Sequence, residues 1–299
     1  MVQVDLREEV RLGIDLLPAG VLADDLYRLA GIHGGDGLEV RPEGEDLLLL
    51  VRHATQVQCP ALARHIRYVT PCREHYSVRS RCPCVRLSVE ADLREKFPGL
   101  DAHLVEVHGL RVAERSERLD AFVPILVREF REHLVLETLK DEPFLRCYRD
   151  FYWRVGIDPT KIRPASEALL RRVLQGKDLP RINTLVDAYN LASMKTRISI
   201  AAFDGAHLRG DLRMRHAREG EEFLGIGMEK AAVLKGVEVV CEDDDGLTAV
   251  YPYRDAHRTR VTTATADTVF MTCGVPGIGP RALIEAAETT KEFVERFCR

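Results

Sequence analysis

The chain has 299 residues, of which 45% are hydrophobic and 30% are charged, a composition typical of folded globular proteins. Its formal net charge of −4 argues against a protein that binds nucleic acid through an overall positive charge. The sequence contains no apolar run of about 18 residues, no secretory signal and no lipidation motif. We therefore expect a cytoplasmic protein that does not bind membranes.

Residues 1–88 differ in pattern from the rest and are expected to form an N-terminal extension or a small domain. They contain four of the eight cysteines, Cys59, Cys72, Cys82 and Cys84. Four thiolates are able to hold a structural zinc ion or an iron–sulfur cluster. The spacing lacks the close cysteine pair that is typical of zinc sites, so reduced thiols without a cofactor are the leading interpretation.

Residues 89–299 begin with signals for a strand and then for helices. Alternating apolar residues predict a strand within 97–112, and apolar residues three and four apart predict a long helix over about 119–134. Pro124 falls early in this helix and is expected near its first turn, because proline is tolerated only there. Two further helices are predicted over 164–177 and 182–194.

The apolar period then changes to two, which predicts short strands separated by glycine or acidic turns. These segments are 197–203, 211–217, 221–226, 237–242, 247–253 and 267–273. Residues 243–246 read DDDG, a sequence typical of a hairpin turn, and a closing helix is predicted from Pro280 to about Cys298. Helices followed by mostly antiparallel strands and a last helix predict an α+β domain over 89–299.

Residues 146–181 are rich in cations although the whole chain is acidic. Lys161, Arg163, Arg171 and Arg172 are expected to face outward along a rigid connection and the helix after it. Such a basic edge is suited to the phosphates of RNA, and a solvated helix face that binds nothing is the alternative.

No nucleophile elbow and no zinc-protease motif occurs, so a catalytic site would have to be assembled from polar groups between residues 187 and 255. Polar side chains that gather at the ends of helices and strands are typical of a recognition pocket. Each of them alone is also compatible with a structural role, such as capping a turn.

The order of these segments resembles the B3/B4 domain of the bacterial phenylalanyl-tRNA synthetase β-subunit. The resemblance rests on Asp187 and Asn190 in the helix, AAFD at 201–204, GDLRMRHA at 210–217 and the Gly220-Glu221 pair. It covers about residues 90–299, and the segment 148–172 resembles the freestanding branch of the family.

The resemblance implies a B3/B4-like fold and a protein that binds tRNA or aminoacyl-tRNA and hydrolyses a mischarged or non-proteinogenic aminoacyl ester in trans. It implies catalytic roles for Asn190, Ser193 and Glu222. The implied substrate-binding residues are Phe203, Asp204, Glu221, Tyr251, Tyr253, Arg254 and Asp255. The family has a histidine at the position of Ala201, so a tyrosine-specific site is not expected. A non-catalytic RNA-binding or interaction module is the alternative, and a small-molecule enzyme is a more distant one.

Overall fold

A computed structural model describes residues 85–299. Its helices are α4 (Ala91–Lys96), α5 (Glu117–His133), α6 (Pro143–Arg154), α7 (Ala165–Leu174), α8 (Thr184–Thr196) and α9 (Pro280–Cys298), with short 3-10 turns η2 (Leu139–Asp141) and η3 (Gly205–His207). Its strands are β1 (Leu87–Val89), β2 (Asp101–Val107), β3 (Ser199–Asp204), β4 (Leu212–His216), β5 (Glu219–Phe223), β6 (Ala232–Lys235), β7 (Val239–Asp243), β8 (Gly246–Tyr251), β9 (Arg254–Asp255) and β10 (Thr268–Gly274). The predicted α+β class is confirmed.

The strands form three sheets, with the orders β1-β4-β7-β8-β9, β2-β10-β3 and β5-β6. The first is antiparallel apart from the β1–β4 pair, and the other two are antiparallel throughout the described chain. Since β1 pairs with β4, strand pairing in this body already begins at Leu87. The other residues of the predicted N-terminal extension, up to residue 84, lie outside the described part of the chain.

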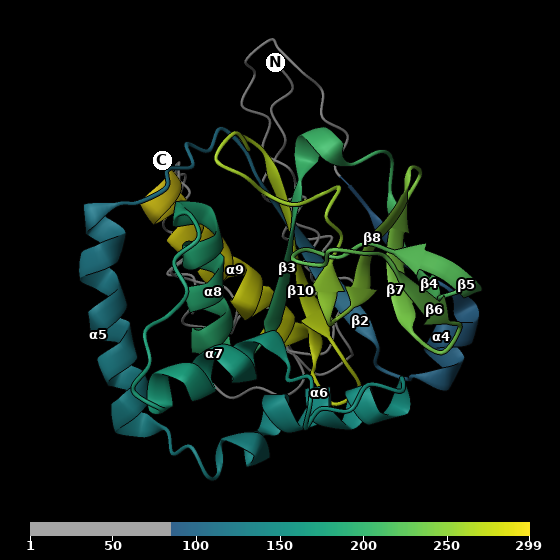
Figure 1. The fold of residues 1–299 in the computed structure, drawn as a ribbon, viewed down its shortest axis with the longest axis horizontal. Coiled ribbons are helices and arrows are strands. Elements are labelled where there is room, and N and C mark those ends of the chain that lie inside the picture. Colours follow the sequence, from purple (N-terminus) through teal and green to yellow (C-terminus); the bar gives the residue numbers. More distant parts are fainter. Residues whose placement is uncertain (1–84) are drawn as a thin grey trace, which may run out of the picture. The chain divides into compact units, whose positions relative to one another are not determined.

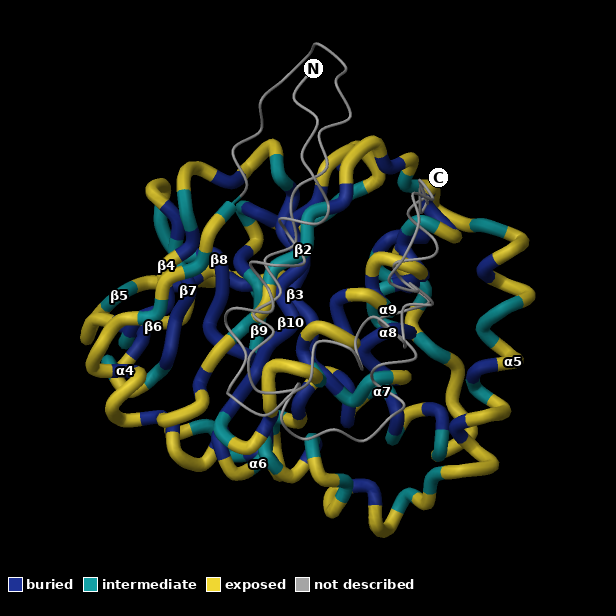
Figure 2. The backbone as a smooth tube through the Cα atoms, turned by 180° about the vertical axis from the view of Figure 1, so that it is seen from behind, coloured by how far each residue is buried: buried dark blue, intermediate teal, exposed yellow. Residues whose placement is uncertain are grey.

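Strands β3 and β10 form the middle layer, and every residue of both is buried (Figure 2). Helices α8 and α9 lie on one side of this layer and strands β7 and β8 on the other (Figure 1). The side chains alternate accordingly: Ile200 and Phe270 pack among the helices, whereas Met271 packs toward the five-stranded sheet. Burial on both faces explains why these strands are almost continuously apolar.

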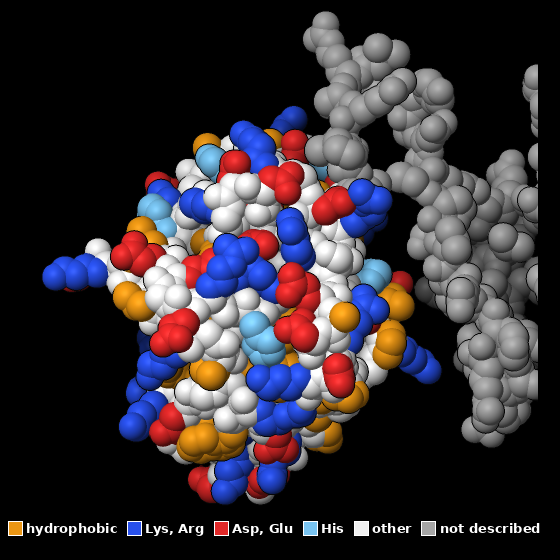
Figure 3. Space-filling view, turned by 90° about the vertical axis from the view of Figure 1, so that its right-hand side faces the viewer, with side chains coloured by type: hydrophobic (Ala, Val, Ile, Leu, Met, Phe, Trp, Pro, Cys, Tyr) orange, Lys and Arg blue, Asp and Glu red, His pale blue; other side chains and the backbone are white. Residues whose placement is uncertain are grey.

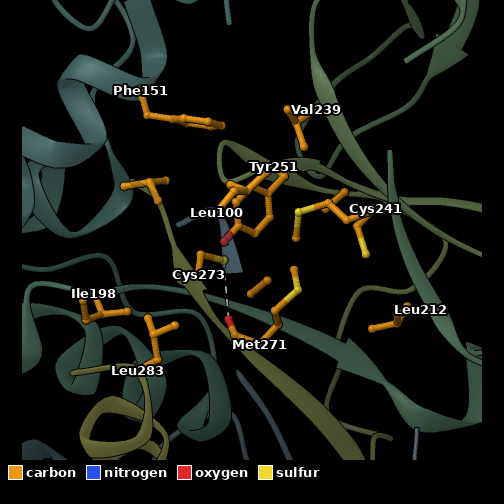
Figure 4. Close-up of a cluster of buried hydrophobic side chains, with 14 of the residues drawn as sticks. Leu100, Phe151, Ile198, Leu212, Val239, Cys241, Tyr251, Met271, Cys273 and Leu283 are labelled. Carbon is orange, nitrogen blue, oxygen red and sulfur yellow. Dashed lines mark hydrogen bonds between the residues drawn. The ribbon is translucent and has the colours of Figure 1, made fainter. Parts of the chain in front are cut away.

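The core between the two larger sheets is shown in Figure 4, where Tyr251 and Cys241 lie close to Met271 and Cys273. The hydroxyl of Tyr251 is within 2.7 Å of the carbonyl oxygen of Gly274 and 3.0 Å of that of Asp101. Burial raises the pKa of the Tyr251 phenol well above its usual range, so it remains protonated. This tyrosine therefore ties the end of β8 to the middle layer.

Local signals explain where the helices begin and end. The side chain of Asn183 caps α8 by accepting a hydrogen bond from the Val186 amide at 2.9 Å. Pro280 occupies the first turn of α9, which has the predicted bounds. The expectation for Pro124 is wrong, because it lies about two turns into α5. Proline has no amide hydrogen, so the carbonyl of Asp120 lacks its usual helical donor at position 124. Both residues are exposed, so water can donate to this carbonyl instead.

Within residues 85–299, no helix combines the length and the apolar character needed to cross a membrane.

Candidate functional site

A cavity of about 150 Å³ opens between β3 and the turn that joins β8 to β9. Its polar lining comes from three elements and the turn: Tyr189, Asn190, Ser199, Tyr253, Arg254 and Asp255. Ala165, the first residue of α7, also lines the cavity and is exposed, so the cavity reaches the surface beside that helix.

The cavity lies beside β3, which pairs with β10 on one side and is an edge strand of its sheet among residues 85–299. Instead, the carboxylate of Asp255 accepts a hydrogen bond from the backbone amide of Ala202 at 3.2 Å. Asp255 belongs to β9, which pairs with β8 through the registers Ala249–Asp255 and Val250–Arg254. One side chain thus joins the two larger sheets, and the space beside it remains open.

Asp255 has an unusual electrostatic environment. Burial raises the pKa of its carboxyl to about 7, and the hydrogen bond from Ala202 opposes this shift only in part. No lysine, arginine or histidine within residues 85–299 forms an ion pair with it. A carboxyl in a cavity with such a displaced pKa is typical of a functional site.

Other polar atoms of the lining also lack partners in the described chain. The hydroxyl of Ser199 is buried, the residue being 2% exposed, and it has no hydrogen-bond partner. The same holds for Nε of Arg254. The rest of the Arg254 guanidinium donates to the carbonyl of Ile226 at 2.6 Å and lies 5.0 Å from the ring centre of Tyr253. Buried polar atoms are rarely left unpaired, so these two atoms are polar positions in the lining that residues 85–299 leave unsatisfied.

The floor beneath Ser199 is firmly held. Its backbone amide donates to the hydroxyl of Tyr148 at 3.0 Å, and that hydroxyl donates to the carbonyl of Cys273. Burial raises the pKa of Tyr148 well above its usual range. The start of β3 is therefore fixed to both α6 and β10, which gives the cavity a rigid wall.

Five of the predicted site residues come together at this cavity: Asn190, Tyr251, Tyr253, Arg254 and Asp255. The structure does not bring Ser193 there. Its hydroxyl donates to the carbonyl of Ile198 at 2.6 Å, and the residue is buried. Ser193 closes the turn between α8 and β3 and is not available to a ligand.

Four other predicted residues also lie away from the cavity. Phe203 is fully buried in the core between the sheets. Asp204 accepts hydrogen bonds from the Thr265 hydroxyl at 2.6 Å and the Ala206 amide at 3.0 Å, so it fixes a turn. Glu221 pairs with Arg215 at 2.7 Å, and the arginine bonds lower the pKa of Glu221. Glu222 is exposed on β5, which pairs with β6 in the small separate sheet.

The predicted RNA-binding residues divide into two groups. Lys161 and Arg163 are exposed, and Lys161 is 3.8 Å from Asp158. Arg171 and Arg172 are engaged within the fold and do not simply face outward. Nε of Arg172 donates to the Asp178 carbonyl, and Nε of Arg171 donates to Glu167 at 2.7 Å.

Glu167 explains the position of Arg171. Its side chain is 0% exposed and is shared by Arg171 and by Arg149, which lies 3.1 Å away. A buried carboxylate needs such partners, because an unpaired charge inside a protein costs several kcal/mol. Arg149 and Arg171 therefore support the fold, and among the predicted residues only Lys161 and Arg163 remain as well exposed cations without a structural partner closer than 3.5 Å.

Several lining residues were not predicted from the sequence, including Ser199, Tyr189 and Ala165. Ser199 opens a strand and Ala165 a helix, positions where small residues are common. The one sequence signal for Tyr189 was its position directly before Asn190 in a predicted helix.

The cysteines proposed as metal ligands, Cys59, Cys72, Cys82 and Cys84, lie outside the described residues. The described cysteines Cys147, Cys241, Cys273 and Cys298 are free thiols. Between residues 85 and 299, no group of three or more His, Cys, Asp or Glu side chains is placed to hold a metal ion.

Comparisons with known proteins identify the family of this domain. None of the curated proteins compared with the chain matches it. A solved structure, an N-terminal fragment of the phenylalanyl-tRNA synthetase β-subunit from Pyrococcus horikoshii, is 13% identical, with a TM-score of 0.40. The similarity covers 75% of this chain and 51% of that one, so the chain spans about half the length of the fragment. The B3/4 domain model matches residues 147–299, just over half of the chain. The resemblance predicted from the sequence is confirmed, and the chain belongs to the B3/4 domain family.

Proposed function

We propose that this protein is a cytoplasmic, freestanding member of the B3/4 family that binds tRNA and hydrolyses a mischarged or non-proteinogenic aminoacyl ester in trans. The observation that carries the proposal is the cavity between β3 and the β8–β9 turn, with its unpaired polar atoms. A pocket of this kind suits a small acyl group that carries hydrogen-bonding atoms.

The reaction demands little covalent chemistry of the protein. Water adds to the acyl carbon of the ester, the bond to the terminal ribose oxygen breaks, and the ribose hydroxyl leaves with a proton. Because an aminoacyl ester is already activated, positioning the water and the ribose supplies much of the required rate. The Asn190 amide is a neutral lining group suited to orient them.

Contacts to the nucleic acid would come from the exposed cations near the mouth of the cavity. Arg163 is two residues before Ala165, which lines the cavity where it reaches the surface. The side of the molecule shown in Figure 3 mixes cationic and acidic side chains and has no uniform basic area. Elsewhere, Lys161 and Arg163 are exposed, and a few local contacts from them would carry the phosphate binding.

One observation favours a second candidate, a binding module without catalysis. Ala201 stands where the sequence resemblance puts the family's histidine, and it lies in the cavity wall. A methyl group there neither polarises a carbonyl nor moves a proton. If the lost histidine was essential to the chemistry, the cavity would still bind an aminoacyl end.

The two candidates are separated by incubating the full-length protein with a panel of mischarged tRNAs and measuring release of the amino acid. Editing predicts turnover of at least one species, lowered at least tenfold by Asn190→Ala and by Ala201→Leu, which fills the cavity. Gln175→Ala removes an exposed amide at the end of α7 and is the matched control. Binding without turnover of any species would establish the module instead, and loss of activity in the control would refute the cavity as the site.

A further inference from the structure

We propose that Asp255 is the counter-ion for an ammonium group of the ligand, so that the cavity selects acyl groups that carry a free, protonated amine. This inference rests on the proposed function and specifies the class of its substrate. It predicts that acyl groups whose amine is blocked or replaced by a hydroxyl are rejected.

Asp255 uses little of its hydrogen-bonding capacity within residues 85–299. One of its oxygens accepts from the Ala202 amide at 3.2 Å. A carboxylate has about four acceptor positions, so most of its capacity remains unused on the cavity side. The chain offers no cation to this carboxylate between residues 85 and 299, although buried carboxylates are usually paired.

The titratable groups around Asp255 carry no positive charge. The titratable groups facing Asp255 are Tyr189 from α8, Cys241 from β7 and Cys273 from β10. Burial raises the pKa of all three, to about 12 for Cys241, so they are neutral at physiological pH. Strand β3 contributes the neutral backbone amide of Ala202.

The neighbouring residue Arg254 does not supply the missing charge. Its guanidinium donates to the carbonyl of Ile226 and lies over the ring of Tyr253, and within residues 85–299 it forms no ion pair with Asp255. Since no side chain among residues 85–299 balances the charge of Asp255, an ammonium group of the ligand is suited to this role. The rings of Tyr189 and Tyr253 in the lining add a favourable environment for an ammonium group.

The volume of the cavity limits the size of the acyl group that it can hold. The cavity volume of about 150 Å³ equals that of an engineered protein cavity that admits benzene, about six non-hydrogen atoms. An ammonium nitrogen, its α-carbon and a side chain of about four carbons together also have about six non-hydrogen atoms. The best ligands are therefore expected to have aliphatic side chains of medium size, and an indole is expected to be too large.

Calorimetric titration with small amides tests the inference without tRNA. The probes are L-alaninamide, L-valinamide, L-leucinamide and L-tryptophanamide, with 4-methylpentanamide as the leucinamide analogue that lacks the amine. Full-length protein should bind leucinamide at least tenfold more tightly than 4-methylpentanamide, the value expected for a hydrogen bond to a charged group. Asp255→Asn should abolish that ratio. Asp244→Asn, which changes an exposed aspartate at the β7–β8 turn, should preserve it.

Equal affinity for the two compounds, or no binding of any amide, would overturn the inference. Should Asp255→Asn fail to fold, the wild-type protein gives a second measurement. Only ionised Asp255 attracts the ammonium, so leucinamide should bind about 15- to 20-fold less tightly at pH 5.5 than at pH 7.5 and should release protons on binding at pH 6. The amine itself loses its charge above about pH 8, which gives a bell-shaped profile. A flat profile contradicts the proposal.

A tRNA experiment separates this inference from the proposed function. A substrate identified in the deacylation panel is compared with its counterpart in which the amine is replaced by a hydroxyl. Equal hydrolysis of both would leave the deacylase standing and refute the ammonium contact. Asp255-dependent binding of amides without hydrolysis of any tRNA would do the reverse. A drop on both substrates alike in Asp255→Asn would assign Asp255 to the activation of water instead.

Discussion

Glu167 and Asp255 are two enclosed carboxylates in the same domain with opposite surroundings. Glu167 is completely buried and is held by two arginines, at 2.7 and 3.1 Å. Among residues 85–299, Asp255 has one backbone amide at 3.2 Å and no cation, and its pKa is raised to about 7. Glu167 is a satisfied structural carboxylate, whereas we propose that a ligand completes Asp255. The two residues differ in the cations that the described chain supplies to them.

The largest expected effect comes from changing Glu167. Glu167→Gln leaves two arginines beside a neutral amide and should lower the free energy of unfolding by about 3–5 kcal/mol, as removal of one member of a buried ion pair does. Urea unfolding at pH 7 measures it. Glu285→Gln in α9, an exposed glutamate paired with Arg281, is the matched control and should cost under about 0.5 kcal/mol. A change of less than about 1 kcal/mol in the unfolding free energy of Glu167→Gln would contradict the structural role assigned to Glu167.

Asp255→Asn is the same chemical change and should behave differently. The folded-state pKa of Asp255 lies above its unfolded value of 3.8, so its contribution to stability is complete below pH 4 and is lost as the pH rises through about 7. Between these values the wild-type protein should lose up to about 1.4 kcal/mol per pH unit relative to Asp255→Asn. Parallel pH profiles for the two proteins would show that the carboxyl is not destabilised by burial.

Arg171 should give an intermediate effect, and its substitution tests whether it supports the fold or contacts RNA. Arg171→Ala leaves Glu167 with Arg149 alone and should cost about 1–3 kcal/mol of unfolding free energy, comparable with the loss of a hydrogen bond to a charged group. At a temperature where the variant is folded, tRNA affinity should be unchanged. If affinity falls while stability is kept, Arg171 belongs to the RNA surface after all.

The smallest effect on stability is expected at Arg163, whose exposed side chain lies near the cavity mouth. Arg163→Glu should change the unfolding free energy by less than about 0.5 kcal/mol. It should weaken tRNA binding and lower the slope of log affinity against log salt by about 1, the value for one phosphate contact. Arg281→Glu, on an exposed face of α9, serves as the control for added negative charge.

Much of the fold was predictable because local signals coincide with tertiary packing. Helix α9 runs from Pro280 to Cys298 as expected, since proline, apolar spacing and the chain pattern agree. The short strands β6 and β9 were not expected, because two to four residues carry no period.

The site was harder to predict for reasons that particular residues show. Helix α8 is surrounded by α7, α9 and β3, so it has no exposed face that would reveal its rotation. Asn190 therefore reaches the cavity while Ser193 closes a turn. Asp204 and Asp255 look equivalent in the sequence, and the difference lies in Thr265, a partner of Asp204 that is 61 residues away.

The hydrogen bond from Ala202 to Asp255 makes one backbone amide a spectroscopic reporter of the cavity. Its donor strength responds to the charge of the carboxyl, so the amide nitrogen and proton resonances of Ala202 should titrate near pH 7 although neither atom ionises. A ligand that neutralises or displaces Asp255 should move the same resonance and alter the exchange of this amide with solvent. A single labelled alanine would thus read out protonation and occupancy together, before any substrate has been identified.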